Sequence, residues 1–257
     1  MAAKPASYPA ATGRAAQTVA DHGAEEELVF WGAWFCPFTQ RSWITLEEKS
    51  LKYQYREVNP YDKPAELLGI SPKGLVPILQ NTTTNTITTD SLAILHNLQA
   101  THPSPNLLPP APADQATAED WLAHINTTVV PSFFRLMQAQ LSNSSQLTKA
   151  LEEFTAAIAL ISNARQEGGP FFYGEEISLV DIAIAPWTVR DFIIREFRGW
   201  NRDAVPKWKE WAEILEVRES VVRTTSVKKY VEFNGTFLRD ESYSQAAKAA
   251  RSGLAIP

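Results

Sequence analysis

The chain has 257 residues, of which 44% are hydrophobic and 21% are charged, enough for one large or two modest globular domains. Its formal net charge is −5 and no basic block stands out, which argues against nucleic-acid binding as its main role. A single cysteine, Cys36, excludes an internal disulfide framework and a four-cysteine zinc site, and the four histidines lack metal-ligand spacing, so no metal site is expected.

The first 26 residues carry no targeting signal that we can identify. They contain no apolar signal-peptide core, and no stretch of the chain approaches about 18 consecutive apolar residues, the length of a membrane helix. We therefore expect a cytoplasmic protein without a stable membrane span. Residues 1–26 are rich in Ala, Pro, Ser, Thr and Gly, so we expect an N-terminal extension that is mobile or loosely docked.

The next stretch combines a strand, a cysteine and a helix start. Residues 28–35 are apolar and aromatic, as expected of a short buried strand. Cys36 follows, and Pro37 suits the first turn of a helix, which we expect over residues 37–50. The N–H groups and dipole at a helix start favour an anion, so Cys36 should carry more thiolate than a free cysteine, with Arg41 adding positive potential. The alternative is a buried structural cysteine.

The residues that follow predict the order β-α-β-α-β-β-α. The further elements are a strand at 53–58, a short helix at 64–68, a strand after Pro77, a turn at 82–85, a strand at 86–89, and a helix through residue 100 capped by Asp90 and Ser91. The strand–helix–strand order implies that the first two strands are parallel. Pro77 follows a glycine turn, so the Val76–Pro77 bond is a candidate cis bond, the alternative being an ordinary trans proline. Residues 27–102 should form one domain.

The second half of the sequence reads as helix throughout. Residues 103–113 are rich in proline and form the clearest linker in the chain. The domain at 114–257 should contain helices at 113–141 (interrupted or kinked near Pro131), 145–167, 178–197, 206–217, 220–231 and 235–250. Ser178 is a candidate N-cap, and Asp181 stands in the reciprocal position of a capping box. Asp181 is therefore interpreted as structural.

The order of elements resembles a known family. The first domain, with a cysteine–proline pair at the end of its first strand, resembles a thioredoxin fold, and with the helical domain it resembles a glutathione S-transferase. The motifs that agree are residues 73–77 before the candidate cis-proline, 89–91 at the third helix and 178–181 at a later helix. The resemblance covers about residues 27–240. It implies an α/β plus all-α fold, a thioredoxin-like domain followed by an α-helical bundle.

The sequence around the cysteine narrows the resemblance to a class. Cys36, Pro37 and Phe38 resemble the Omega, or cysteine-type, class, which also carries an N-terminal extension. Two residues depart from related patterns: Asp90 is shorter than the Glu often found there, and Thr39 stands where dithiol redox proteins have a second thiol. The helical half matches weakly beyond residue 187. The second-substrate pocket is therefore the least transferable part of the resemblance.

The resemblance implies a site for glutathione as co-substrate. Asp90 would pair with the amine of the γ-glutamyl group, while Ser91 and the N–H groups of that helix start would hold its carboxylate. The backbone of Val76, extended before Pro77, would pair with the cysteinyl part. Without the resemblance, Asp90 and Ser91 are equally readable as helix caps.

Two further residues complete the implied glutathione site. Lys63 precedes a proline, as in the Omega pattern, and would meet the glycine carboxylate, whereas by itself it reads as a solvated lysine. Phe38 would cover the thiol region, although it could equally face the core. The candidates for a second-substrate pocket, expected between the domains, are Trp121, Phe134, Trp187 and Arg190.

The implied reaction is monothiol chemistry. Cys36 would form a mixed disulfide that glutathione itself resolves, because the chain has no second cysteine. This predicts a thioltransferase or dehydroascorbate reductase type of glutathione transferase, acting on a small electrophilic or disulfide substrate and assembled as a homodimer. Tyr- or Ser-type members instead stabilise the thiolate of glutathione for conjugation.

Two alternatives stay open. Residues 36–41 also resemble the non-enzymatic chloride intracellular channel family, which shares the fold and associates with membranes. Glu47, Glu48 and Lys49 make the corresponding helix costly in lipid and argue against that alternative. The other alternative is a tailoring enzyme that uses glutathione on one specific small metabolite, which differs only in the second pocket.

Overall fold

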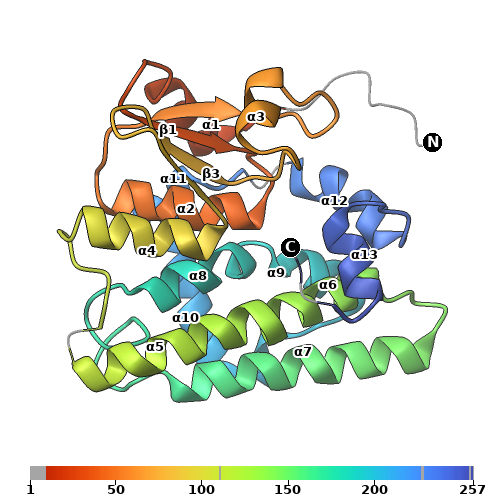
Figure 1. Cartoon of the computed structure of the whole chain (residues 1–257). Coiled ribbons are helices and arrows are strands. Elements are labelled where there is room, and N and C mark those ends of the chain that lie inside the picture. Colours follow the sequence, from red (N-terminus) through yellow and green to blue (C-terminus); the bar gives the residue numbers. More distant parts are fainter. Residues whose placement is uncertain (1–9, 110, 227–228, 255, 257) are drawn as a thin grey trace. The chain divides into compact units, whose positions relative to one another are not determined.

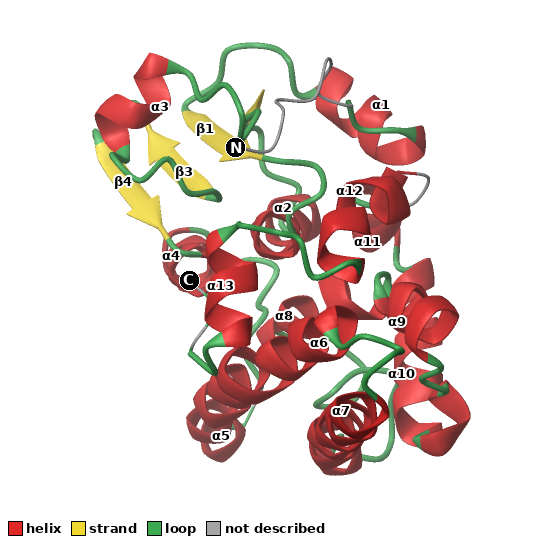
Figure 2. Ribbon diagram, turned by 90° about the vertical axis from the view of Figure 1, so that its right-hand side faces the viewer, coloured by secondary structure: helices red, strands yellow, loops and turns green. Residues whose placement is uncertain are grey.

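The computed structural model describes residues 10–109, 111–226, 229–254 and 256, which fall into two compact units. The mixed unit comprises Met1–Asn106 and Arg218–Lys229, and the helical unit comprises Leu107–Val217 and Tyr230–Pro257. All the strands drawn in Figure 2 belong to the mixed unit. The boundary after Asn106 lies inside the predicted linker. Residues 218–229, which we expected in the helical domain, group instead with the mixed unit.

The mixed unit is built on a four-stranded sheet of order β2-β1-β3-β4. Strand β1 (Leu28–Gly32) pairs in parallel with β2 (Gln54–Glu57), as the βαβ order predicts, and antiparallel with β3 (Ile78–Asn81). Strand β4 (Thr86–Thr89) pairs antiparallel with β3 and forms one edge. The predicted thioredoxin-like arrangement is confirmed, with strands somewhat shorter than the apolar runs that signalled them.

Alternation along β1 divides the core of the mixed unit into two layers. Leu28 and Phe30 pack with residues of α2 (Pro37–Glu48) and α4 (Ser91–Thr101), which lie side by side in Figure 1. Val29 and Trp31 face the other way, toward α3 (Ala65–Ile70). The first layer holds α2 and α4 against one face of the sheet, and α2 begins directly after Cys36.

A glycine at the end of β1 lets α2 approach the sheet. A Cβ added at Gly32 would lie 2.6 Å from Cγ2 of Thr39, in the first turn of α2. The Thr39 hydroxyl in turn accepts a 3.4 Å hydrogen bond from the backbone N–H of Ala33. Any larger residue at position 32 would therefore push the start of α2, and with it Cys36, away from the strand.

Part of the N-terminal extension is an ordered helix, which corrects the expectation of a mobile or loosely docked tail. Helix α1 (Gly13–Asp21) buries Ala15 completely in the core that it shares with α2 and α4. The Thr18 hydroxyl donates to the carbonyl of Arg223 at 2.8 Å, so α1 also contacts the returning segment that contains α11 (Glu219–Arg223). Residues 1–9 lie outside the described residues.

The helical unit contains α5 (Pro112–His124), η1 (Ile125–Val129), α6 (Val130–Gln138), α7 (Ser144–Ala164), α8 (Leu179–Thr188), α9 (Asp191–Arg198), η2 (Arg202–Ala204), α10 (Pro206–Val217), α12 (Tyr230–Leu238) and α13 (Gln245–Arg251). The predicted interruption near Pro131 is confirmed, because the π-helical segment η1 immediately precedes α6. Within the described ranges, no helix is long and apolar enough to cross a bilayer.

Three helix predictions were wrong in their extent. The expected helix 178–197 is two helices, since α8 ends before Val189 and α9 begins at Asp191. The expected helix 220–231 ends at Arg223. The expected helix 235–250 consists of the end of α12 and the separate α13. In each case the expected helix is interrupted, and helical periodicity alone does not locate such breaks.

The capping box at the start of α8 is confirmed. The Asp181 carboxylate accepts hydrogen bonds from the N–H and the hydroxyl of Ser178, at 2.9 and 2.6 Å. Its other oxygen accepts from the N–H of Phe172 and from the indole of Trp211, both at 2.8 Å. Burial nonetheless raises the pKa of Asp181 above its ordinary value, against the opposing effect of these hydrogen bonds. Asp181 is thus a structural anchor of the helical unit.

Candidate functional site

Cys36 is the N-cap of α2, in the position that its sequence context predicted. Its backbone is extended, and its sulfur accepts a 3.5 Å hydrogen bond from the N–H of Thr39 in the first helical turn. Sulfur thus occupies a place usually taken by a hydroxyl or carboxylate oxygen, where a negative charge is favoured. The thiol is partly exposed, so it is not the fully buried structural cysteine of the alternative interpretation.

The segment before β3 brings a backbone carbonyl to the cysteine. The Cys36 thiol lies 3.9 Å from the carbonyl oxygen of Val76. The Val76–Pro77 bond is cis, as predicted, and so is the Ser104–Pro105 bond, which was not predicted. Val76 is partly exposed. A peptide that paired with the Val76 backbone would therefore lie directly beside the thiol.

Asp90 caps α4 from an unusual backbone conformation. Its φ is 76° and its ψ is 133°, a region that non-glycine residues rarely adopt and that is enriched at functional sites. The carboxylate accepts from the N–H groups of Leu92 and Ala93 at 2.9 and 3.0 Å, and both bonds end on Oδ1. The side chain is exposed, and Oδ2 takes no part in the cap.

A buried arginine connects the beginnings of α2 and α4. Arg41 is fully buried, and its Nη1 lies 3.3 Å from the hydroxyl oxygen of Ser91. Burial lowers the pKa of Arg41 to about 9, while the negative charges of Asp90 and Cys36 act to raise it. The guanidinium therefore remains protonated at neutral pH. The sequence analysis assigned Arg41 only a general positive potential. It could not predict the contact with Ser91, because the two residues are 50 positions apart in the chain.

The other two predicted glutathione contacts lie in the same unit. The Lys63 ammonium donates a 3.0 Å hydrogen bond to the carbonyl of Lys73, in the loop that leads to Val76. The ring of Phe38 lies beneath the Arg41 guanidinium, 5.4 Å from ring centroid to guanidinium carbon. The mixed unit thus contains all the predicted glutathione-site residues, namely Cys36, Phe38, Lys63, Val76, Pro77, Asp90 and Ser91.

The candidates for the second substrate all belong to the helical unit. Phe134 on α6 and Arg190 at the start of α9 both contact α12: Phe134 packs on Phe237 with ring centroids 5.6 Å apart, and Arg190 donates to the Tyr230 hydroxyl at 2.9 Å. Trp187 on α8 is fully buried.

Trp121 on α5 lies elsewhere, against the ring of Phe172 at 5.7 Å. The structure therefore groups Phe134 with Arg190 but not with Trp121. The sequence analysis missed Tyr230 and Phe237, the α12 residues that contact Arg190 and Phe134. It divided this region between two expected helices, 220–231 and 235–250, instead of the single helix α12.

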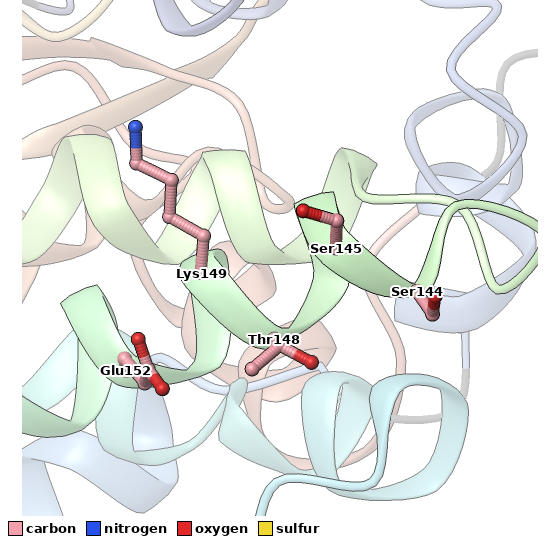
Figure 3. Close-up of a pocket in the computed structure, with 5 residues that line it drawn as sticks. All are labelled: Ser144, Ser145, Thr148, Lys149 and Glu152. Atoms are coloured by element: carbon pink, nitrogen blue, oxygen red, sulfur yellow. The ribbon is translucent and has the colours of Figure 1, made fainter.

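The helical unit also has a cavity of about 380 Å³ that involves none of these candidates. Figure 3 shows its lining at the start of α7, formed by Ser144, Ser145, Thr148, Lys149 and Glu152. All five side chains are polar or charged and stand on one helix. Because all of its lining residues stand on one helix, this groove is a feature of the helix surface and we do not propose it as a substrate pocket.

Comparison with known proteins gives matches in both halves of the chain. Residues 35–101 match the family of the glutathione S-transferase N-terminal domain, and residues 119–213 match the family of the C-terminal domain. The solved structure of glutathione transferase Omega 3C from Trametes versicolor is 42% identical, with a TM-score of 0.80, over 85% of this chain and 97% of that chain.

Two plant proteins are also similar. Glutathione S-transferase DHAR2 of Arabidopsis thaliana is 28% identical over 198 residues, which are 76% of this chain and 86% of that protein. Rice GST1, solved in complex with glutathione, is 28% identical with a TM-score of 0.74, over 84% of this chain and 100% of that chain. The similarity thus extends well beyond the cysteine motif.

Proposed function

This chain belongs to the glutathione S-transferase family, and on that premise we propose that it is a cysteine-type, Omega-like transferase that exchanges thiols with glutathione. The observation that carries the proposal is the placement of Cys36 as the N-cap of α2, with its sulfur bonded to the N–H of Thr39 and 3.9 Å from the Val76 carbonyl. The 42% identity to an Omega structure supports the enzyme over the channel-like alternative.

Glutathione is proposed to bind along the mixed unit. Asp90 Oδ2 holds the γ-glutamyl amine, and the hydroxyl and N–H groups of Ser91, at the start of α4, hold its carboxylate. The cysteinyl backbone pairs with Val76, as an added strand would, which brings the glutathione sulfur to Cys36. Lys63 releases the Lys73 carbonyl to meet the glycine carboxylate.

The proposed reaction consists of two thiol–disulfide exchanges. The Cys36 thiolate attacks the glutathionyl sulfur of a mixed disulfide, so the substrate leaves as a thiolate and is protonated, and Cys36 becomes bonded to glutathione. The thiolate of a second glutathione attacks that glutathionyl sulfur, releasing oxidised glutathione and the Cys36 thiolate. The backbone N–H of Thr39 stabilises the sulfur anion that begins and ends the cycle.

The finer features of the proposal concern substrate, assembly and location. The substrate is a small disulfide, or a dehydroascorbate-like electrophile that takes two electrons as Cys36 and a first glutathione become the same mixed disulfide. The candidates for binding it are Trp121, Phe134, Trp187 and Arg190. We further propose that the protein is cytoplasmic and works as a homodimer, as its family resemblance implies. A tailoring enzyme that uses the same glutathione site would differ only in the second-substrate residues.

The proposed function is tested by comparing exchange with conjugation. We expect the purified protein to reduce the mixed disulfide of glutathione and 2-mercaptoethanol, and to do so faster than it conjugates glutathione to 1-chloro-2,4-dinitrobenzene. Cys36→Ser should abolish the exchange, and mass spectrometry should find one glutathionyl group on the parent and none on this variant. Full exchange activity in Cys36→Ser, or no binding of millimolar glutathione by the parent, would contradict the proposal.

A further inference from the structure

Arg41 links the helix that begins after Cys36 to the start of the second helix of the proposed glutathione site. Its backbone lies on α2 after Cys36, while its Nη1 reaches the Ser91 hydroxyl at the start of α4. Its guanidinium carbon is also 5.4 Å from the centroid of the Phe38 ring. One buried side chain of the helix that Cys36 caps therefore reaches both the Phe38 ring and the first residue of the helix proposed to bind the γ-glutamyl group.

The hydrogen bond to Ser91 has a defined direction. A guanidinium has donors and no acceptor, so the Ser91 oxygen is the acceptor at 3.3 Å. The hydroxyl hydrogen of Ser91 consequently points away from Arg41 and remains a donor for another acceptor. A carboxylate at the start of α4 is such an acceptor, and it would also meet the N–H of Ser91, because those of Leu92 and Ala93 already donate to Asp90.

The charge of Arg41 acts on the cysteine as well. Burial lowers the pKa of Arg41 to about 9, and the charges of Asp90 and Cys36 oppose that effect. Electrostatic interaction is mutual, so the buried guanidinium favours a negative charge on Cys36, the residue that caps its own helix. This effect weakens little with salt because Arg41 is fully buried.

We propose that Arg41 is a positioning residue that couples the two halves of the site, favouring the thiolate of Cys36 while directing the Ser91 hydroxyl toward the γ-glutamyl carboxylate. This inference rests on the proposed function for its ligand. It assigns to one residue two effects: a contribution to thiolate formation beside that of the Thr39 N–H, and the orientation of a donor 50 positions away.

Two variants separate the charge of Arg41 from its geometry, and a third is a matched control. Arg41→Gln removes the charge, whereas Arg41→Lys keeps it but loses the planar fork of donors. Lys49→Met removes another buried cation of the same unit, whose Nζ donates to Gln99, His102 and Pro105 at 2.9, 2.7 and 2.8 Å. Because Cys36 is the only cysteine, iodoacetamide alkylation reports on that residue alone.

The readouts are the pH profile of alkylation and the affinity for glutathione. For Arg41→Gln we expect the pH of half-maximal alkylation to rise by about one pH unit and the glutathione Kd to increase roughly tenfold. Arg41→Lys should keep the parent alkylation profile but bind glutathione several-fold more weakly. Lys49→Met should melt at a lower temperature with both readouts unchanged, as a purely structural role predicts.

The outcomes distinguish this inference from the proposed function. A folded Arg41→Gln protein with the parent alkylation profile and Kd would overturn the positioning role. If that variant does not fold, the glutathione affinities of Arg41→Lys, Ser91→Ala and the double variant decide instead. Strictly additive losses of binding free energy would mean that Arg41 and Ser91 are not coupled. If the parent binds no glutathione, the proposed function fails, whereas the alkylation profiles still decide whether Arg41 acts on Cys36.

Discussion

Glu48 accepts two hydrogen bonds from the guanidinium of Arg218, each 2.8 Å long, although the residues are 170 positions apart. Glu48 lies at the end of α2, and its side chain is 7% exposed, whereas that of Arg218 is 39% exposed. The Ser220 hydroxyl contacts the same carboxylate. This cluster fastens the returning segment at 218–226 to the helix that begins at Cys36.

Removing Arg218 should destabilise the mixed unit. Arg218→Ala leaves a nearly buried carboxylate with fewer donors, so we expect the free energy of unfolding to fall by about 2 kcal/mol. Arg14→Ala is the control, because Arg14 pairs with Glu219 on the same segment but both side chains are exposed, at 60% and 65%. Such a pair contributes at most about 0.5–1 kcal/mol. Urea unfolding measures both, and equal losses would show that the Glu48 pair has no special role.

The neighbouring carboxylate, Glu47, should make the mixed unit sensitive to acid. Burial raises its pKa, but hydrogen bonds from His22 and Tyr53 and the charge of Arg223 outweigh burial and hold the pKa below its ordinary value. A carboxyl whose pKa is lowered in the folded state stabilises the fold at any pH above its ordinary pKa. This contribution is lost as the pH falls through the lowered, folded-state pKa.

The Glu47→Gln variant tests this sign. We expect the parent to exceed the variant in unfolding free energy at neutral pH, and the difference to shrink as the pH falls below the ordinary pKa of 4.5 for a glutamate. Urea unfolding from pH 7 down to pH 3 follows the difference. A gap that stays constant with pH would mean that Glu47 contributes through packing and not through its charge.

Local signals predicted the parts of the structure that local chemistry determines. Three features that depend only on neighbouring residues appear as expected: the helix start at Pro37, the strand at 86–89, and the capping box of Ser178 and Asp181. The seven glutathione-site residues were placed through motifs of the same short range. Their roles remain predictions.

Long-range contacts determined what the sequence did not reveal. Helix α1 is short, and its residues contact distant parts of the chain. Arg14 and Thr18 have partners on residues 219–223, and Ala15 packs into the core of the sheet. The Arg41–Ser91 bond joins two helices that only the fold brings together. No periodicity within a window of a dozen residues carries such information.

One substitution should separate the proposed role of Asp90 as a ligand contact from its role as a helix cap. Asp90→Asn retains an Oδ1 that can accept from Leu92 and Ala93, and asparagine tolerates positive φ, so the melting temperature should change little. The ligand amine, however, loses its charged partner, so glutathione binding should weaken at least about tenfold. Calorimetric titration beside a melting curve measures both. Unchanged affinity would restrict Asp90 to capping α4.

Lys63 should recognise the glycine end of glutathione, and Gly74 should keep it in place. The Lys63 ammonium donates to the Lys73 carbonyl at 3.0 Å, and a Cβ added at Gly74 would lie 2.6 Å from the Lys63 Cδ. Gly74→Ala therefore displaces the Lys63 chain, in addition to straining a residue with φ of 56°. Lys63→Ala removes the ammonium without altering that loop backbone directly.

Comparing two ligands isolates this contact. For Lys63→Ala we expect glutathione to bind roughly three- to tenfold more weakly, because a flexible lysine holds a carboxylate as a point charge. γ-Glutamylcysteine lacks the glycine carboxylate, so its affinity should be the same for the variant and the parent. Lys73→Ala removes an adjacent exposed charge while retaining the carbonyl that Lys63 contacts, and it should leave the preference between the two ligands unchanged. Equal weakening of both ligands by Lys63→Ala would mean that Lys63 supports the loop before Val76 and does not contact the glycine.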